Sequence, residues 1–310
     1  MAHFLVFWNN GPQIKPPHDR NILQHIADHL KPESNQAFNE DLTDTDSLLI
    51  DPMEEMFEAY YSTLIAKLYD ENMNRQLQHK IVYSAMHGVG AQFIDEAFKA
   101  ASLPPVVHVP EQKDPNPEFP TVAFPNPEEG KASLHLSFKT AEEHGAIYIL
   151  ANDPDADRLA VAQKSSDGKW KIFNGNEIGA MLAWWQMQTH FKQYGDTYLR
   201  HNLYFLASTV SSKMLRSIAT SEGLSFEETL TGFKWMANRA YDLEQDLGKK
   251  VLLAYEEAIG FMCESQVLDK DGGEWGCDET RFYFEWGLLV RVGVSGGQWG
   301  SVGSFSQTRL

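Results

Sequence analysis

The stretch AIYILANDPDADRLAVA, residues 146–162, places three aspartates at alternate positions between two apolar runs. The first run, 146–151, predicts a buried strand, and Asp153, Asp155 and Asp157 follow it directly. In open α/β sheets ligands bind beyond the carboxyl ends of the strands, so the carboxylates are expected at such a site. Carboxylates held this close repel one another unless a cation neutralises them, and oxygen ligands favour a hard divalent ion. The stretch therefore predicts an α/β fold with a magnesium site.

This acidic loop has two competing interpretations. A solvated turn is one, because Asn, Asp and Pro are ordinary loop formers and acids can face water. An EF-hand is excluded: counting from Asp153, Arg158 stands at the sixth position, which needs Gly, and Lys164 at the twelfth, which needs Glu. Three features favour the metal site: the strand before the loop, the apolar run 159–162 after it, and Arg158. The arginine could contact a phosphate or the ligands of the metal.

The composition of the chain argues against nucleic acid as a partner. Its 310 residues include 43 acidic and 26 basic side chains, for a formal net charge of −17, and 43% are hydrophobic. That length and hydrophobic content allow two or three domains with real cores. The charge argues against nucleic acid, whose binders carry clustered Lys and Arg. We expect a monomer that binds a small molecule.

Cysteine usage and the absence of targeting signals predict a cytoplasmic protein. Cys263 and Cys277 form neither a disulfide framework nor paired metal ligands, which suits a reducing compartment. No apolar run approaches membrane-spanning length, and the opening run 4–8 lacks the basic flank and cleavage site of a secretory signal. The same run is strand-like and enters the turn 9–12 directly, so we expect the chain to start within a domain.

Apolar periodicity predicts strands that alternate with helices, as in βα domains with parallel or mixed sheets. The predicted helices cover 21–30, the segment from Pro52 with Asp51 as its cap, 92–101, 134–144, 177–190 and 211–222. The predicted strands cover 81–85, 106–109, 146–151, 159–163, 169–173, 204–208 and 251–254. Residues 159–173 form a predicted hairpin, and the six prolines of 110–131 predict an irregular connection.

Two further loops carry candidate binding residues. Thr231, Gly232 and Lys234 combine a Gly turn with a cation, and Glu256 stands at the carboxyl end of the strand 251–254. Alone, each is more typical of a helix start with a solvated Lys or of an acidic first helical turn. Together with the acidic loop they offer a metal site, a cation with backbone amides and a carboxylate suited to sugar hydroxyls. The set predicts a pocket for a phosphosugar.

Two other polar residues have ordinary default roles. His87 stands beside Gly88 in a predicted turn, and a lone His more often fills an interior or turn position than a functional one. Lys270 lies between two aspartates and is by default a surface cation.

The order of several motifs resembles the α-D-phosphohexomutase family, most closely its phosphoglucomutase-2 and phosphopentomutase branch. The resemblance covers roughly 4–272. The motifs that carry it are YSAMHGVG (83–90), VPEQKDPNPEFPTVAFPNPEEGKASL (109–134), ANDPDADRLAVA (151–162), STVSSKMLR (208–216), EETLTGFKWMANRA (227–240) and YEEAIGFM (255–262).

The resemblance implies four domains around a cleft: a phosphoserine domain, a metal domain, a sugar-selecting domain and a phosphate-binding domain. It implies that the present chain has a domain 1 remnant with a linker at 1–46, domain 2 with the metal loop at 47–164, and domain 3 with the sugar loop at 165–271. Residues 272–310 form a divergent Gly-rich tail, for which we expect disorder or loose packing.

The resemblance also implies a role for each matched residue. Asp153, Asp155 and Asp157 match the magnesium ligands of the family. The positions that bind the sugar are matched by Thr231, Gly232, Lys234, Glu256 and Ala258, the last standing where many relatives have Ser. Arg158 and Lys270 match basic residues near the reacting phosphate and are the catalytic candidates. In full-length relatives an activator of the glucose 1,6-bisphosphate type is expected.

The chain departs from the family at both ends, which shapes the functional hypotheses. No Ser-His dipeptide occurs in it, so the phosphoserine loop, read as TASHNP in the family, is missing. The arginine and serine loop of the family's C-terminal phosphate-binding domain is expected well after Asp271, and the Gly-rich tail contains nothing like it. We expect a truncated phosphosugar mutase homologue of carbohydrate metabolism, for glucose 1- and 6-phosphate or ribose and deoxyribose 1- and 5-phosphate, that is inactive alone.

Two alternatives stay open. One is a noncatalytic fragment that binds sugar phosphate and metal or regulates another protein. The other, less favoured, is a haloacid dehalogenase-like phosphatase, in which Thr or Val is expected at the position of Asp157.

Overall fold

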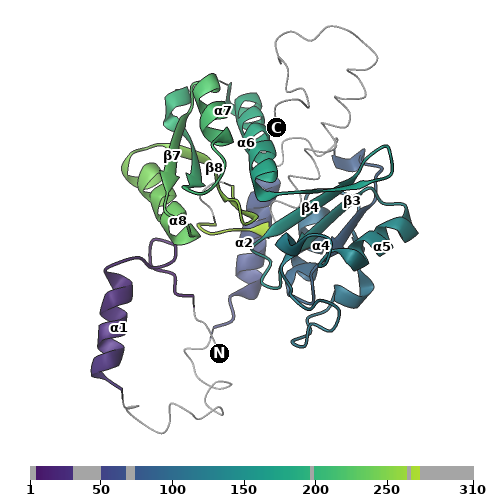
Figure 1. The fold of residues 1–310 in the computed structure, drawn as a ribbon. Coiled ribbons are helices and arrows are strands. Elements are labelled where there is room, and N and C mark those ends of the chain that lie inside the picture. Colours follow the sequence, from purple (N-terminus) through teal and green to yellow (C-terminus); the bar gives the residue numbers. More distant parts are fainter. Residues whose placement is uncertain (1–4, 31–49, 68–73, 196–198, 264–266, 273–310) are drawn as a thin grey trace.

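The computed structural model describes residues 5–30, 50–67, 74–195, 199–263 and 267–272. Two mixed sheets form its centre, and Figure 1 shows them in separate halves of the molecule, with α6 (Gly175–Tyr194) packed on the second. The predicted tandem α/β domains are therefore confirmed. The predicted tail beyond residue 272 and the linker 31–46 lie outside the described residues.

The first sheet has the strand order β2-β1-β3-β4-β5. Its parallel strands are β1 (Ile81–Ser84), β2 (Val107–His108) and β3 (Tyr148–Asn152), followed by the antiparallel β4 (Leu159–Lys164) and β5 (Trp170–Phe173). Every residue of β1 and β3 is buried, as expected for strands covered on both faces. The cover consists of α2 (Met53–Lys67) and α4 (Gly90–Ala100) on one face and α5 (His135–His144) on the other.

The second sheet has the strand order β7-β6-β8-β9. Its parallel strands are β6 (Leu203–Ser208), β7 (Ser225–Thr229) and β8 (Lys250–Glu256), and β9 (Gly260–Met262) is antiparallel to β8. Helices α6 and α7 (Met214–Glu222) cover one face, and α8 (Phe233–Tyr241) covers the other. A π-helical turn, η7 (Asp242–Asp246), continues α8.

Most predicted elements are confirmed, and the cap predicted at Asp51 is present. Asp51 accepts a hydrogen bond from the Met53 N–H at 3.0 Å at the start of α2. Asn174 and Glu177 form a capping box that starts α6. The Pro-rich segment 110–131 is irregular apart from two short 3₁₀ turns, η3 (Pro110–Gln112) and η4 (Pro127–Glu129).

Three predictions differ from the structure. Strands β7 and β9 were not predicted, because β7 is a half-buried edge strand and β9 has three residues. The acidic helical turn considered for Glu256 is wrong, since this residue ends β8 and the chain reverses into β9. In the described part of the opening run, a single antiparallel bridge between Phe7 and Gln13 replaces the expected strand. Helix α1 (His18–Asp28) then follows, with no buried residue among those described.

The predicted boundary between residues 164 and 165 falls inside the β4–β5 hairpin, so the first sheet extends to Phe173. The division of the chain into four parts stays a prediction.

The two sheets meet where their strands end. The Leu159 N–H donates to Ile259 O at 3.1 Å, and Arg158 forms an isolated bridge with Gly260. Gly175 approaches the same turn so closely that a Cβ there would lie 2.1 Å from Glu257 O. The acidic loop after β3 therefore lies against the β8–β9 turn.

The turn after β1 supports the acidic loop from the other side. The Val89 N–H donates to Pro154 O at 2.9 Å, and a Cβ on Gly88 would lie 2.2 Å from Pro154 Cα and O. Only a glycine permits this approach, and Pro154 stands between two of the candidate metal ligands.

Gly88→Ala is expected to lower the free energy of unfolding by about 1–3 kcal/mol, because the added methyl group overpacks the turn. It is also expected to weaken the binding of Mn²⁺, a divalent probe for the predicted magnesium site, since Pro154 must move. Urea denaturation and Mn²⁺ titration measure the two effects. The control, Gly168→Ala, adds a methyl group in open space at φ +83°. It should lose about 1–2 kcal/mol through backbone strain and keep its Mn²⁺ affinity; unchanged affinity in Gly88→Ala contradicts the argument.

Candidate metal centre and neighbouring loops

The three aspartates of the acidic loop converge as the sequence predicts. One carboxylate oxygen from each of Asp153, Asp155 and Asp157 lies within 4.8 Å of the other two. Asp153 is 2% exposed at the end of β3, Asp157 is half-buried and Asp155 is exposed. The loop is tight: the Ala156 N–H donates to Asp153 O at 2.9 Å, and Ala156 has φ +59°. Three carboxylates in this arrangement match the oxygen ligands of Mg²⁺.

One atom of the loop tests whether a cation fits. The Oδ1 atom of Asp157 is buried and accepts no hydrogen bond within the described part of the chain. Its ion-pair partner is Arg158, whose Nε lies 3.8 Å away, too far for a hydrogen bond. A buried carboxylate oxygen without a hydrogen bond is costly, and a coordinated cation removes that cost. The donor set and this oxygen therefore fit a magnesium ion held by the three aspartates.

Burial and repulsion both favour protonation of the metal-free loop. Burial raises the pKa of Asp153 to about 7; repulsion from Asp157 and Asp155 adds to the rise, and Arg158 opposes it. Burial also raises the pKa of Asp157, against the attraction of Lys270. A bound cation would take the place of a proton here.

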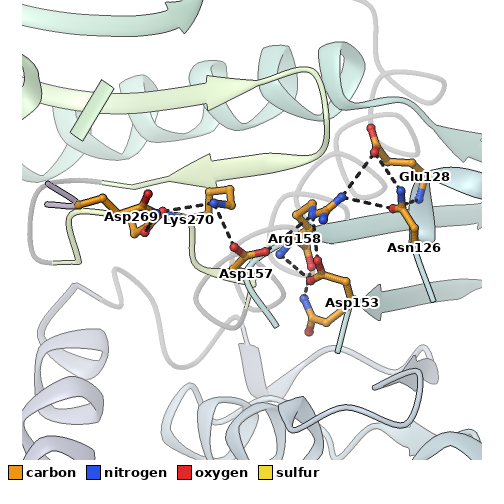
Figure 2. Close-up of polar contacts among 9 residues, drawn as sticks. Asn126, Glu128, Asp153, Asp157, Arg158, Asp269 and Lys270 are labelled. Atoms are coloured by element: carbon orange, nitrogen blue, oxygen red, sulfur yellow. Dashed lines mark hydrogen bonds and ion pairs between the residues drawn. The ribbon is translucent and has the colours of Figure 1, made fainter. Parts of the chain in front are cut away.

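Arg158, the residue before β4, stabilises the acidic loop through contacts with Asp153 (Figure 2). Its Nε lies 2.8 Å from Asp153 Oδ2, and its backbone N–H donates to Asp153 Oδ1 at 3.0 Å. Its Nη1 lies 3.5 Å from both Glu128 Oε2 and Asn126 Oδ1. One third of the side chain stays exposed. The guanidinium is thus fixed beside the carboxylates on a side chain that is only partly buried.

Lys270 reaches the loop from beyond the second sheet. Its Nζ lies 3.0 Å from Asp157 Oδ2 and 3.3 Å from Asp269 Oδ1 (Figure 2). Burial alone would lower the pKa of Lys270, but the two carboxylates outweigh it and raise the pKa. The side chain is only 13% exposed, so its default interpretation as a surface cation is wrong.

The sugar-loop candidates lie together at the start of α8. Gly232, with φ +107°, turns the chain into the helix, and Thr231 is exposed before it. Lys234 lies with its Nζ 5.2 Å from the ring centroid of Trp235. Burial raises the pKa of Glu256, while Lys270 and a hydrogen bond from the Gly232 backbone oppose the rise. Glu256 therefore joins this loop to the metal loop.

Because position 260 is a glycine, Lys270 and Glu256 can both lie close to the chain there. A Cβ there would lie 2.5 Å from Lys270 Cδ and 3.2 Å from Glu256 Cγ. Ala258 stands half-buried in the same β8–β9 turn. The predicted site residues thus lie on the acidic loop, at the start of α8, in the β8–β9 turn and in the separate turn that carries Lys270, although their roles stay predictions.

Several residues that shape the site were not predicted. Asn126 and Glu128 come from the Pro-rich segment, where the Asn-Pro pair signals a turn but not its contact with Arg158. Glu257 accepts hydrogen bonds from Ser208 and Ser211, both at 2.9 Å, which ties the β6 loop to the β8–β9 turn.

His87 has the structural role expected of it. It is buried, and its Nε2 lies 2.8 Å from Thr121 Oγ1, so it anchors the Pro-rich segment.

Comparison with known proteins identifies the class to which this fold and loop arrangement belong. The profile described as phosphoglucomutase/phosphomannomutase, alpha/beta/alpha domain II, matches residues 58–168, and that of domain III matches 174–274. The chain belongs to the phosphoglucomutase/phosphomannomutase family. The resemblance inferred from the motifs is confirmed, and the haloacid dehalogenase alternative finds no support in these matches.

The relatives are mutases and a synthase of sugar phosphates by name. Phosphopentomutase of Homo sapiens is 51% identical over 269 residues, and glucose 1,6-bisphosphate synthase of Homo sapiens is 45% identical over 269 residues. These matches cover 87% of this chain but 44% and 43% of the relatives, so the chain spans less than half of their length.

A solved structure supports the fold. N-acetylphosphoglucosamine mutase of Aspergillus fumigatus, in complex with GlcNAc-6P and magnesium, superposes with a TM-score of 0.53 at 13% identity. The superposition covers 76% of this chain and 52% of that protein. Among the described helices, none combines the length and apolar character that a bilayer crossing requires.

Mn²⁺ affinity is expected to fall as the pH is lowered from 8 to 6. Because the folded, metal-free chain holds a proton on Asp153 below pH 7, the ion must displace it. The affinity should be nearly constant above pH 7 and fall about tenfold per unit below it. Titration calorimetry at several pH values measures this slope.

Asp153→Asn should bind Mn²⁺ more weakly and show a flatter slope, because the titrating ligand is gone. Asp167→Asn, in the exposed β4–β5 turn, should behave as the unmodified chain. Affinity that does not change between pH 6 and 8 contradicts the assignment.

Proposed function

We propose that these domains form the metal-binding and sugar-binding parts of a phosphosugar mutase of the phosphopentomutase and phosphoglucomutase type. The substrates would be ribose or deoxyribose 1- and 5-phosphate, or glucose 1- and 6-phosphate. The observation that carries the proposal is the continuity of the site: Asp157, Lys270 and Glu256 adjoin one another where the two sheets meet. Two phosphosugar enzymes among the relatives at 45–51% identity support it.

In this proposal Asp153, Asp155 and Asp157 hold Mg²⁺, which would neutralise charge on a phosphate when bound. The chain's own groups then position the ligand. Arg158, fixed by Asp153 and Glu128, presents its guanidinium to a phosphate, for which a planar donor fork is suited.

The remaining groups orient the sugar and balance its charge. Lys270 supplies a second cation that two carboxylates keep protonated. The Glu256 carboxylate accepts hydrogen bonds from sugar hydroxyls, and Thr231, Gly232 and Lys234 line the start of α8 beside it. Ala258 offers no hydroxyl at the position where many relatives have Ser.

We further propose that the 310-residue chain by itself binds a sugar phosphate without turning it over, because it contains no Ser-His loop to donate a phosphoryl group. A bisphosphate activator of the glucose 1,6-bisphosphate type belongs to the full mutase reaction. The same binding without turnover would serve a regulatory role, which the noncatalytic alternative describes. We place the chain in the cytoplasm as a monomer, on the basis of its cysteine usage and charge.

Turnover is tested by incubating the chain with Mg²⁺, glucose 1,6-bisphosphate and either ribose 1-phosphate or glucose 1-phosphate. No 5- or 6-phosphate should form above the rate without protein. Formation of either product in repeated turnovers contradicts the proposed incapacity. Calorimetry with ribose 5-phosphate and glucose 6-phosphate, with and without Mg²⁺, should still detect binding.

Glu256→Gln is expected to weaken ribose 5-phosphate binding by about tenfold, since charged hydrogen bonds to hydroxyls are lost. Inorganic phosphate, which has no sugar hydroxyls, should bind with unchanged affinity, and the two ligands are compared by calorimetry. The control is Glu222→Gln, which lies near the end of α7. An equal loss for both ligands would show that Glu256 does not face the sugar.

A further inference from the structure

Lys270 occupies a short turn, Asp269–Gly272, that four other parts of the chain hold in place. Gln13 Nε2 donates to Asp269 Oδ2 at 2.7 Å, and Tyr60 Oη donates to Asp271 Oδ2 at 2.7 Å. The Asp271 N–H donates to Phe261 O and the Gly272 N–H to Ala156 O, both at 3.0 Å. Only the last of these contacts involves the acidic loop, so the turn is a junction of several elements.

Asp269 stands between Gln13 and Lys270. Its Oδ2 accepts from Gln13, while its Oδ1 accepts from the Lys270 backbone N–H at 2.8 Å and lies 3.3 Å from Lys270 Nζ. The hydrogen bond from Gln13 to Oδ2 therefore fixes the orientation of the Asp269 carboxylate, and with it the position of Oδ1. Since Asp269 and Asp157 share the ammonium group, the orientation of Asp269 sets how Lys270 lies over the metal carboxylate.

The stem of Lys270 has little freedom of its own. Its Cδ lies against Gly260, where a Cβ would come within 2.5 Å, and its Nζ lies 5.0 Å from the ring centroid of Phe233. With the stem confined, the ammonium position depends on the carboxylates around it: Asp157 and Asp269, with which it pairs, and Glu256, which also attracts it.

Residues 6–14 form a short N-terminal hairpin, closed by the Phe7–Gln13 bridge, that is anchored independently on α8. Asn238, 3% exposed, donates from Nδ2 to Gln13 O at 3.0 Å and to Lys234 O at 2.7 Å. Its Oδ1 accepts from Asn10 Nδ2 at 3.2 Å. Gly11 packs beside Leu268, with only 3.0 Å from an added Cβ to Leu268 Cδ1. The hairpin is thus fixed to the helix that begins with the sugar loop.

We propose that Gln13 is a positioning residue that, through Asp269, holds the Lys270 ammonium on Asp157 beside the metal carboxylates. The N-terminal hairpin then takes part in the site without touching a ligand. The part of this inference that concerns metal affinity rests on the proposed metal site, whereas the placement of Lys270 does not.

The first test measures the placement of Lys270 without metal. In Gln13→Leu, acylation of Lys270 by a dilute amine-reactive anhydride, followed by mass spectrometry, should be several times faster than in the unmodified chain. Lys164, which pairs with Glu142 in the first sheet, serves as the internal reference and should react at the same rate in both chains. The matched control Gln24→Leu removes an exposed Gln–Asp hydrogen bond, to Asp28 in α1, and leaves Asp269 untouched, so it should keep the slow Lys270 rate. An unchanged Lys270 rate in Gln13→Leu, or an equal rise at Lys164, overturns the proposal.

The second test is a double-mutant cycle read out as Mn²⁺ affinity. Lys270→Met should raise the affinity about tenfold, because a cation next to a ligand carboxylate is removed. Gln13→Leu should raise it about threefold in the unmodified chain and have no further effect in the Lys270→Met chain, since the two act as one unit. An equal effect in both backgrounds would mean that Gln13 acts on the fold and would overturn the proposal.

The two tests separate the possible failures. If the unmodified chain binds no Mn²⁺ but Gln13→Leu still accelerates acylation of Lys270, the metal site fails and the positioning role stands. Should Gln13→Leu fail to fold, Gln13→Glu replaces it. This variant keeps the size of the side chain, sets a like charge against Asp269, and should accelerate acylation of Lys270 in the same way. An unchanged rate in that variant also overturns the proposal.

Discussion

Repulsion among three carboxylates at the end of a buried strand is the constraint to which the rest of this site responds. Asp153 is buried and Asp157 is half-buried. Burial and repulsion from the neighbouring carboxylates both raise the pKa values of these two groups. A proton, a cation or neighbouring donors must compensate the charge. The loop itself supplies only Arg158, so the remaining compensation comes from other elements. The contact between the two sheets at this point is therefore electrostatic as well as apolar.

Compensation from distant elements explains why the site needs both sheets. Glu128 orients Arg158 from the Pro-rich segment, and Lys270 reaches Asp157 from beyond β9. Lys270 lowers the pKa of Asp157 and of Glu256 against the effect of burial, so both carboxylates respond to the same cation. A change of charge at Asp157 is therefore expected to affect Glu256 through Lys270.

Local sequence patterns predicted the parts of the site that depend on near neighbours. The apolar run before Asp153 and the alternate spacing of the acids defined β3 and the metal loop, because strand burial and loop chemistry are local properties. Glycine and an aromatic-flanked Lys234 marked the start of α8. Gln13, by contrast, carries no local signal, since its partner Asp269 is 256 positions away in the sequence. Edge strand β7 was missed because half-buried residues follow no clean alternation.

The same distinction explains why a structural argument adds to the family match. Motifs place metal and sugar residues on separate loops, but they cannot state which groups hold those loops at a fixed separation. Here Asn238 connects the hairpin at Gln13 to the backbone of Lys234, and Asp269 connects the hairpin to Lys270. The start of α8 and the turn that carries Lys270 are thus both held by one hairpin. Because fixed loops need less ordering when a ligand binds, the hairpin in our proposal would contribute to binding through preorganisation and not through contact.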